Sequence, residues 1–263
     1  MPHEQRPHLD PPVPLLLGSR NGGDSPAGPR YANARMREAT LVAARMLTPS
    51  VRELTFDPGP GHHHVPGHWV TLFRDDLKRQ YSVASAQRGD GTFDLAVTLV
   101  QGGPMSTWLH EMALGARVRM LDAQGLFVLE PMVRPILFVA TGTGLAPFRA
   151  MLQEIEAKAA APPSIELIFG CRTEDDILYR DELEALALRR PSFTFHPTLS
   201  RAPESWHGRR GYVQTHLAES VERMGKDLDV YVCGLTRMVK DVRTICRETL
   251  GVDRKRVHIE RYD

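Results

Sequence analysis

The sequence contains few cysteines. Only Cys171, Cys233 and Cys246 occur among its 263 residues, and they are widely spaced. A disulfide framework, a zinc site or an iron–sulfur cluster needs cysteines in pairs or groups at short intervals. The spacing therefore excludes these three kinds of site, and a chain of this kind is expected in a reducing, cytoplasmic compartment.

Two further features are missing, an excess of charge of one sign and a long apolar run. Lysine and arginine number 33 against 32 for aspartate and glutamate, which gives a formal net charge of +1. This balance gives no reason to expect nucleic acid or an anionic membrane as a partner. No apolar run approaches the roughly 20 residues of a membrane-spanning helix. The apolar stretch from Pro14 to Leu17 is too short for the core of a signal peptide.

The first 33 residues are poor in side chains that could form a core. Seven of the 20 prolines and four of the 21 glycines precede Tyr31. Such a segment buries too little apolar surface to offset the entropy of ordering it. We predict a flexible extension over residues 1–33, with a docking arm for a partner as the alternative.

Two different apolar patterns meet near Pro131 to Pro135 and divide the rest of the chain. Before this point, turns rich in proline and glycine separate short β-type segments at residues 39–45, 51–56, 68–73, 80–84 and 93–100. After it, apolar strands occur at 136–140, 165–170, 193–198, 229–233 and 257–262. Helical stretches alternate with these strands near 148–160, 181–190, 214–224 and 236–250. We predict an antiparallel barrel domain over residues 34–131 and a parallel, doubly wound sheet over residues 132–263.

The segment Arg79-Gln80-Tyr81-Ser82 places a cation, an aromatic ring and a hydroxyl at the end of a predicted strand. A flavin needs a flat apolar or aromatic wall, hydrogen bonds at its ring edge and a cation for its phosphates. Arg79 and Tyr81 share one face of a strand and Ser82 points away from it, so the three can act together only if the strand ends there. An edge strand with a solvated arginine is the alternative.

Two glycine-containing turns each have the character of a pyrophosphate site. Gly102 and Gly103 follow a strand and lead into a predicted helix with Ser106 in its first turn. Backbone N–H groups at a helix start, together with a hydroxyl, bind an anion. A hairpin turn followed by a capped helix is the alternative.

The second turn is Thr141-Gly142-Thr143-Gly144, between an apolar strand and a helix predicted to start near Phe148. Its glycines let the backbone approach phosphate oxygens. It is not a Walker loop, because no Gly-Lys-Ser/Thr follows. It also differs from the usual dinucleotide fingerprint, because Pro147 replaces the last glycine.

A cluster of arginines and hydroxyls follows the third strand of the second half. A ribose 2′-phosphate favours arginine forks and hydroxyl donors, whereas an unphosphorylated ribose is usually held by an acidic residue. We therefore predict a preference for NADPH over NADH, with solvated loop arginines as the alternative. The candidate residues are Ser200, Arg201, Arg209 or Arg210, and Tyr212.

From about residue 36 to the C-terminus the chain resembles the plant-type ferredoxin–NADP reductase superfamily. Besides the motifs above, Pro66 to Val70, Gly125 to Phe127 and Cys233-Gly234 carry the resemblance. It implies a flavoprotein oxidoreductase with FAD on a six-stranded antiparallel barrel and NADP(H) on a five-stranded parallel sheet. Hydride would pass between NADP(H) and FAD, and single electrons between FAD and a separate carrier, ferredoxin or flavodoxin. The candidate cofactor-binding residues are then Arg79, Tyr81, Ser82, Val83, Ala84, Ser85, Gly102, Gly103, Met105, Ser106, Thr141, Gly142, Thr143, Gly144, Pro147, Ser200, Arg201, Arg209, Arg210, Tyr212, Gln214, Cys233 and Gly234.

The resemblance also implies a hydride-transfer centre formed by Ser82, Cys233, Glu260 and Tyr262. Cys233 would lie beside the nicotinamide ring and position it without acting as a nucleophile; a small packing residue is the alternative. Glu260 and Tyr262 match a C-terminal Glu-x-Tyr whose tyrosine covers the flavin. Asp263 departs from that pattern by extending the chain one residue further, and a frayed, exposed end is the alternative.

Three other interpretations remain open. His62-His63-His64 with His68 could bind a metal, although a solvated loop is expected because the zinc-site spacing is lacking. An NADH-dependent reductase component of an oxygenase, or a cytochrome b5 reductase-like enzyme, would keep the fold. A non-catalytic electron-transfer subunit is the alternative from another class. For the carrier, Arg74, Lys78 and Arg88 offer a basic surface, and a monomer is favoured.

Overall fold

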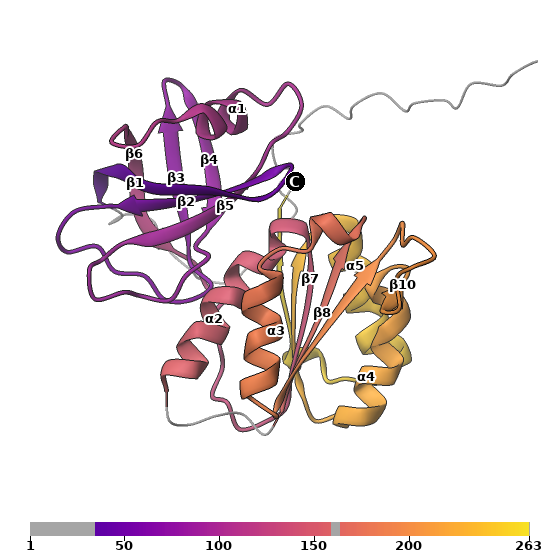
Figure 1. Ribbon diagram of the computed structural model, residues 1–263. Coiled ribbons are helices and arrows are strands. Elements are labelled where there is room, and N and C mark those ends of the chain that lie inside the picture. Colours follow the sequence, from indigo (N-terminus) through magenta and orange to yellow (C-terminus); the bar gives the residue numbers. More distant parts are fainter. Residues whose placement is uncertain (1–34, 159–163, 263) are drawn as a thin grey trace, which may run out of the picture. The chain divides into compact units, whose positions relative to one another are not determined.

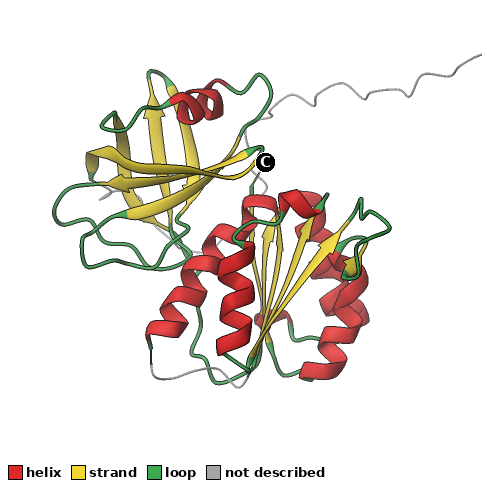
Figure 2. Cartoon of the chain, in the orientation of Figure 1, coloured by secondary structure: helices red, strands yellow, loops and turns green. Residues whose placement is uncertain are grey.

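The computed structural model describes residues 35–158 and 164–262. The predicted extension over residues 1–33 and the terminal Asp263 lie outside these ranges. Residues from Ala34 onward group into one compact unit. Within it, residues 36–124 form a mostly β half, and strands alternate with helices over residues 136–261 in an α/β half (Figures 1 and 2).

The first half is a six-stranded antiparallel sheet, as predicted. Its strands are β1 (Met36–Thr48), β2 (Val51–Asp57), β3 (Trp69–Arg74), β4 (Leu77–Ser82), β5 (Phe93–Thr98) and β6 (Arg117–Gln124). They lie in the order β4-β3-β6-β1-β2-β5. An antiparallel bridge between Val83 and Leu95 joins the two edge strands and closes the barrel.

Strand β6 is missing from the predicted segments because half of its first four residues are arginines. In the structure Val118 and Met120 point into the barrel core, while Arg117 and Arg119 face solvent. This alternation is typical of a strand with one buried face. Helix α1 (Pro104–Glu111) adds Met105 and Leu109 to the same core.

The second half is a parallel sheet in the order β10-β9-β8-β7-β11-β12. The five expected strands are β7 (Ile136–Thr141), β8 (Ile165–Cys171), β9 (Phe193–Leu199), β11 (Asp229–Gly234) and β12 (Val257–Arg261). The two-residue β10 (Arg209–Arg210) adds a sixth. The helices are α2 (Leu145–Ala157), α3 (Arg180–Arg189), α4 (Leu217–Met224) and α5 (Thr236–Thr244). No helix in the described ranges is long and apolar enough to cross a membrane.

Helices cover both faces of the parallel sheet, so its central strands are apolar on both sides (Figure 2). In β7, Ile136 and Phe138 pack toward α2 and α3, while Leu137 and Val139 pack toward α4 and α5. Strand order reverses at β7, because β8 and β9 continue to one side and β11 and β12 to the other. Ligands of such sheets bind beyond the carboxyl ends of the strands at this reversal. The glycine turn after β7 lies there.

Candidate active site

The carboxyl end of β12 meets the end of β4. The Ser82 hydroxyl donates a hydrogen bond to Glu260 Oε2 at 3.1 Å, across 178 positions of sequence. Ser82 is the last residue of β4, which satisfies the condition under which Arg79, Tyr81 and Ser82 can act together. The structure therefore brings one predicted flavin-side residue and one predicted tail residue into direct contact.

Glu260 lies beside Cys233, because β11 and β12 pair in parallel with these two residues in register. The Cys233 side chain is completely buried. Burial, reinforced by Glu260, raises the pKa of Cys233 well above its usual range, so the thiol stays protonated and neutral. Burial also raises the pKa of Glu260 to about 7, against the opposing effect of the Ser82 hydrogen bond. Near neutral pH this carboxyl can therefore hold or release a proton, whereas the thiol cannot act as a thiolate nucleophile.

The glycine turn packs closely against the end of β11. Gly142 to Gly144 form one turn of 3₁₀ helix, which continues into α2 at Leu145, three residues earlier than predicted. A Cβ on Gly144 would lie 2.3 Å from the carbonyl oxygen of Cys233. Gly144 is therefore needed for contact between the two strand ends, in addition to the approach to phosphate that the sequence suggested. Pro147 lies in the first turn of α2, where a missing backbone N–H costs no helical hydrogen bond.

The tail is held at the same turn. The Tyr262 hydroxyl donates to the carbonyl oxygen of Thr141 at 2.7 Å and accepts the N–H of Gly144 at 2.8 Å. The backbone N–H of Tyr262 donates to the Gly234 carbonyl at 3.3 Å. The ring is partly buried against the core beneath α2 and α3. Tyr262 thus has defined partners rather than belonging to a frayed end, and whether it covers a flavin stays a prediction.

On the flavin side, the residues after β4 are buried and bonded to β5. The backbone N–H of Ala84 donates to the Asp94 carbonyl at 2.8 Å, and the Ser85 hydroxyl accepts the Asp94 N–H at 3.0 Å. Tyr81 is half-buried, and burial raises its pKa to about 12. Arg79 is exposed, with its guanidinium donating to the neighbouring Lys78 carbonyl. Arg79 is thus available to an anionic ligand.

The start of α1 is shaped by Ser106. Its hydroxyl accepts the N–H of Val100 at 3.1 Å and donates to the Gly103 carbonyl at 3.0 Å. This hydroxyl therefore holds the turn that contains Gly102, whose φ is +71°. Two apolar side chains just before the turn, those of Leu99 and Val100, are exposed.

The predicted phosphate clamp, the cluster of arginines and hydroxyls expected to hold a ribose 2′-phosphate, contains two arginines that bind other groups of the protein. Arg209 donates to Glu219 at 3.1 Å and lies 3.8 Å from the buried Glu166. Arg210 donates to backbone carbonyls of the loop that precedes it, those of Ala202, Pro203, Glu204 and Trp206.

Two other members of the predicted clamp, Arg201 and Tyr212, are exposed beyond the end of β9. Ser200 is exposed there too, although its hydroxyl donates to the Cys171 carbonyl. Gln214 instead donates to Asp241 at 3.4 Å. Arg209 and Arg210 are thus engaged by other groups of the protein, whereas Arg201 is exposed beyond the end of β9.

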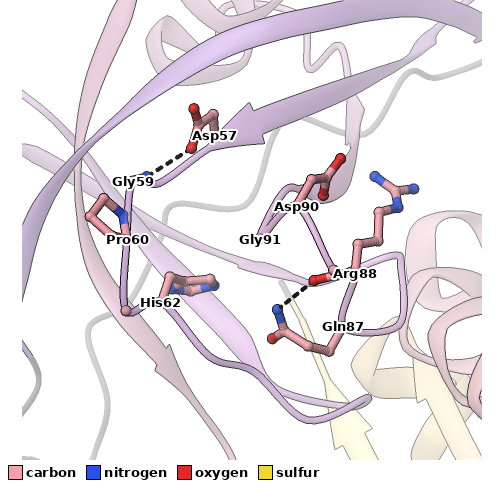
Figure 3. Close-up of a pocket in the computed structure, with 10 residues that line it drawn as sticks. Asp57, Gly59, Pro60, His62, Gln87, Arg88, Asp90 and Gly91 are labelled. Atoms are coloured by element: carbon pink, nitrogen blue, oxygen red, sulfur yellow. Dashed lines mark hydrogen bonds between the residues drawn. The ribbon is translucent and has the colours of Figure 1, made fainter.

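Two histidines of the cluster contact other residues of the barrel. His62 Nδ1 lies 3.3 Å from Asp122 Oδ1, and His64 Nε2 lies 3.0 Å from the Ser85 carbonyl. Burial lowers the pKa of His64 to about 4, so its ring is neutral. His62 borders a surface pocket (Figure 3), whose other lining residues are Asp57, Gly59, Pro60, Gly61, Gln87, Arg88, Gly89, Asp90 and Gly91. Within residues 35–158 and 164–262 no three or more histidine, cysteine, aspartate or glutamate side chains are grouped so that they could hold a metal ion.

Sequence reasoning missed Arg149. This side chain on α2 is only 6 % exposed, and it binds residues from both halves of the chain. The available signal was a single arginine inside the apolar run Leu-Ala-Pro-Phe-Arg-Ala-Met-Leu. A lone charged residue on a helix with few polar neighbours is rarely buried without partners.

Comparison with known families and proteins agrees with this geometry. Residues 38–128 match the family described as "Oxidoreductase FAD-binding domain", and residues 138–244 match "Oxidoreductase NAD-binding domain". The chain is 48% identical over 238 residues to "Ferredoxin--NADP reductase B" of Sorangium cellulosum, covering 86% of this chain and 97% of that protein.

Two further comparisons extend this similarity. "Toluate 1,2-dioxygenase electron transfer component" of Pseudomonas putida is 34% identical over 218 residues, covering 82% of this chain and 62% of that protein. The structure of a ferredoxin NADP+ reductase from Neisseria gonorrhoeae with bound FAD and NADP superposes with a TM-score of 0.75 at 24% identity. It covers 87% of this chain and 99% of that one, and at this identity the likeness concerns the fold.

Proposed function

The chain belongs to the ferredoxin–NADP reductase family of FAD- and NAD(P)-binding oxidoreductases, and we propose that it exchanges electrons between NADPH and a separate small carrier protein. The observation that carries the proposal is the contact between Ser82 and Glu260, next to the buried Cys233. It places a hydroxyl, a carboxyl with a pKa of about 7 and a neutral thiol at one point. This point lies at the carboxyl edge of the sheet.

The residues present fit both nucleotides. The exposed guanidinium of Arg79 and the backbone N–H groups at the start of α1 suit the phosphates of FAD, and Tyr81 with exposed Leu99 and Val100 suits its rings. The turn of Gly142 and Gly144, where α2 begins, suits the pyrophosphate of NADP(H). FAD, when bound, accepts a hydride from NADPH and passes electrons singly to a carrier.

In this proposal the chain's own side chains position the reactants and hold one proton. Cys233 is a buried, neutral packing residue beside the nicotinamide site. Glu260 takes up or releases a proton near pH 7, and the Ser82 hydroxyl, bonded to it at 3.1 Å, conducts that proton toward the flavin edge. Tyr262 must release the N–H of Gly144 before a nucleotide can use it.

We further propose ferredoxin or flavodoxin as the carrier and NADPH as the preferred nucleotide, in a cytoplasmic setting. Among the basic residues expected to face an acidic carrier, Lys78 is exposed and Arg74 lies over Trp108 at 5.3 Å. Arg88 is bonded to Asp94 and contributes less free charge. Arg209 is paired with Glu219 and is therefore not free to bind a 2′-phosphate. This observation favours a second candidate function, an NADH-dependent reductase component of an oxygenase. The 34% identical relative from Pseudomonas putida is an electron transfer component of a dioxygenase.

Anaerobic stopped-flow spectroscopy of the FAD-loaded protein tests this assignment. We expect NADPH to bleach the oxidised flavin band much faster than NADH does, and ferricyanide to restore it. Faster bleaching by NADH would favour the oxygenase-type reductase. Absence of bleaching with both nucleotides would favour a non-catalytic subunit, and failure to bind FAD would contradict the assignment of Arg79, Tyr81 and Ser82.

A further inference from the structure

Arg149 on helix α2 binds three separate elements of the chain. Its Nη1 donates to the Ala84 carbonyl at 2.8 Å and to Asp94 Oδ2 at 3.0 Å, both in buried surroundings. Its Nε lies 2.9 Å from both carboxylate oxygens of Glu182 on α3. Ala84 follows β4 and Asp94 lies on β5, so one guanidinium connects the barrel to two helices of the α/β half.

The position of Arg149 in the chain gives this contact its significance. Arg149 follows Gly144 by five residues in the helix that grows out of the glycine turn. Ala84 follows Ser82 by two residues. Because a helix is stiff over one or two turns, holding Arg149 on Ala84 sets the distance between the glycine turn and the end of β4. These are the two segments to which the nicotinamide and flavin sites are assigned.

A neighbouring residue on α2 strengthens the same connection. Gln153 lies one helical turn after Arg149, and its side-chain oxygen accepts the N–H of Ala86 at 3.0 Å. Its Nε2 donates to Glu182 Oε1 at 3.1 Å. The stretch from Ala84 to Ala86 is thus bound twice by one face of α2, and Glu182 orients both side chains.

The backbone beneath Arg149 is strained. Tyr179 is buried and has a φ of +52°, a conformation that non-glycine residues with bulky side chains rarely adopt. The centroid of its ring lies 4.3 Å from the guanidinium carbon of Arg149. Local strain of this kind persists where surrounding contacts enforce it, and it concentrates at functional sites.

We propose that Arg149 is a positioning residue for hydride transfer, which aligns the nicotinamide site with the flavin site without touching either ligand. The inference rests on the proposed transfer between NADPH and FAD. An arginine is required because its planar fork serves Ala84, Asp94 and Glu182 in different directions, whereas a lysine ammonium is a single point charge on a flexible stem. Misalignment by a fraction of an ångström to an ångström lowers the rate of a step that depends on near contact of the reacting atoms.

The test compares the two half-reactions of Arg149→Lys with those of the wild-type protein, both loaded with FAD. We expect the limiting rate of flavin reduction by NADPH to fall by about tenfold or more, since misplacement by 1 Å costs up to about a hundredfold. We expect the NADPH concentration at half-saturation and the rate of reoxidation by ferricyanide to stay unchanged. Arg189→Lys is the matched control, because Arg189 pairs with Glu156 between the same two helices but on the surface.

Two results would overturn the inference: flavin reduction in Arg149→Lys at the wild-type rate, or an equal fall in both half-reactions. If Arg149→Lys does not fold, Glu182→Ala serves in its place, because it leaves Arg149 bound to Ala84 and Asp94 and removes one anchor. A slower reductive half-reaction is then expected, and a wild-type rate would overturn the inference. Failure of the wild-type protein to be reduced by NADPH or NADH would instead contradict the proposed function itself.

Discussion

The backbone N–H of Gly144 donates to the hydroxyl of Tyr262 at 2.8 Å, so the tail occupies a donor of the turn proposed to bind NADP(H). The same hydroxyl donates to the Thr141 carbonyl at 2.7 Å, so the phenol is hydrogen-bonded to a backbone group before the turn and to one within it. In the proposed binding mode, a nucleotide and the Tyr262 hydroxyl compete for this one N–H group.

Removing the Tyr262 hydroxyl should strengthen nucleotide binding. A typical intramolecular hydrogen bond contributes about 0.5–1.5 kcal/mol, so Tyr262→Phe should lower the Kd of NADP⁺ by about 2- to 10-fold. Difference spectroscopy of the flavin band during titration measures this. Tyr231→Phe is the matched control, because its hydroxyl accepts the N–H of Glu130 at 2.8 Å away from the turn. Unchanged or weaker binding in Tyr262→Phe would contradict the competition.

Glu260 should make the free energy of unfolding depend on pH. Its folded pKa is raised to about 7, so folding favours the protonated carboxyl and stability is lost as pH rises from about 4.5 to 7. Glu260→Gln cannot ionise and escapes this loss. Its free energy of unfolding should match that of the wild type near pH 4 and exceed it by about 1–3 kcal/mol at pH 8. Urea unfolding at several pH values measures the difference, and a difference independent of pH would show that Glu260 is not perturbed.

Gly144 should tolerate no side chain. In Gly144→Ala the new Cβ would meet backbone atoms of Cys233 at 2.3 and 2.7 Å, and backbone cannot move aside as a flexible side chain can. We expect a loss of about 1–3 kcal/mol or more in the free energy of unfolding, the usual cost of overpacking. Gly89→Ala is the control, since its Cβ would meet no atom within 4 Å. Equal stability of the two variants in urea would contradict this account.

Arg201 should determine the preference for NADPH. It is exposed at the end of β9, whereas Arg209 and Arg210 are bound to carboxylates and to loop carbonyls. A hydrogen bond to a charged group contributes about 1.5–3 kcal/mol. Arg201→Ala should therefore lower kcat/KM with NADPH by about tenfold or more and leave NADH unchanged. If Arg209→Ala shows that selective loss and Arg201→Ala does not, the phosphate lies at β10.

Much of the fold could be predicted because strand and helix patterns are local. The five parallel strands and the helices between them follow from apolar runs that alternate with helical stretches. Strand β6 was missed because the alternating Arg117 and Arg119 make its sequence look polar, although the residues between them are buried. Strand β10 was missed because a segment of two residues shows no apolar periodicity. Of the site, Ser82, Cys233, Glu260 and Tyr262 were chosen by motif, and the structure brings all four to one edge of the sheet.

By itself, the sequence determined which chemical groups are available and where each strand ends. The reason is that a motif directly after an apolar strand identifies both the side chains and the end of the strand at which they lie. Only the tertiary structure decided which groups are already engaged. It assigned Arg209 to Glu219, Ser106 to its own turn and Arg149 to both halves of the chain. The physical reason is that a charged or polar side chain binds whatever the fold brings within about 3 Å. The partners of Arg149 lie 65 and 55 positions away in the sequence, at separations that no local pattern encodes.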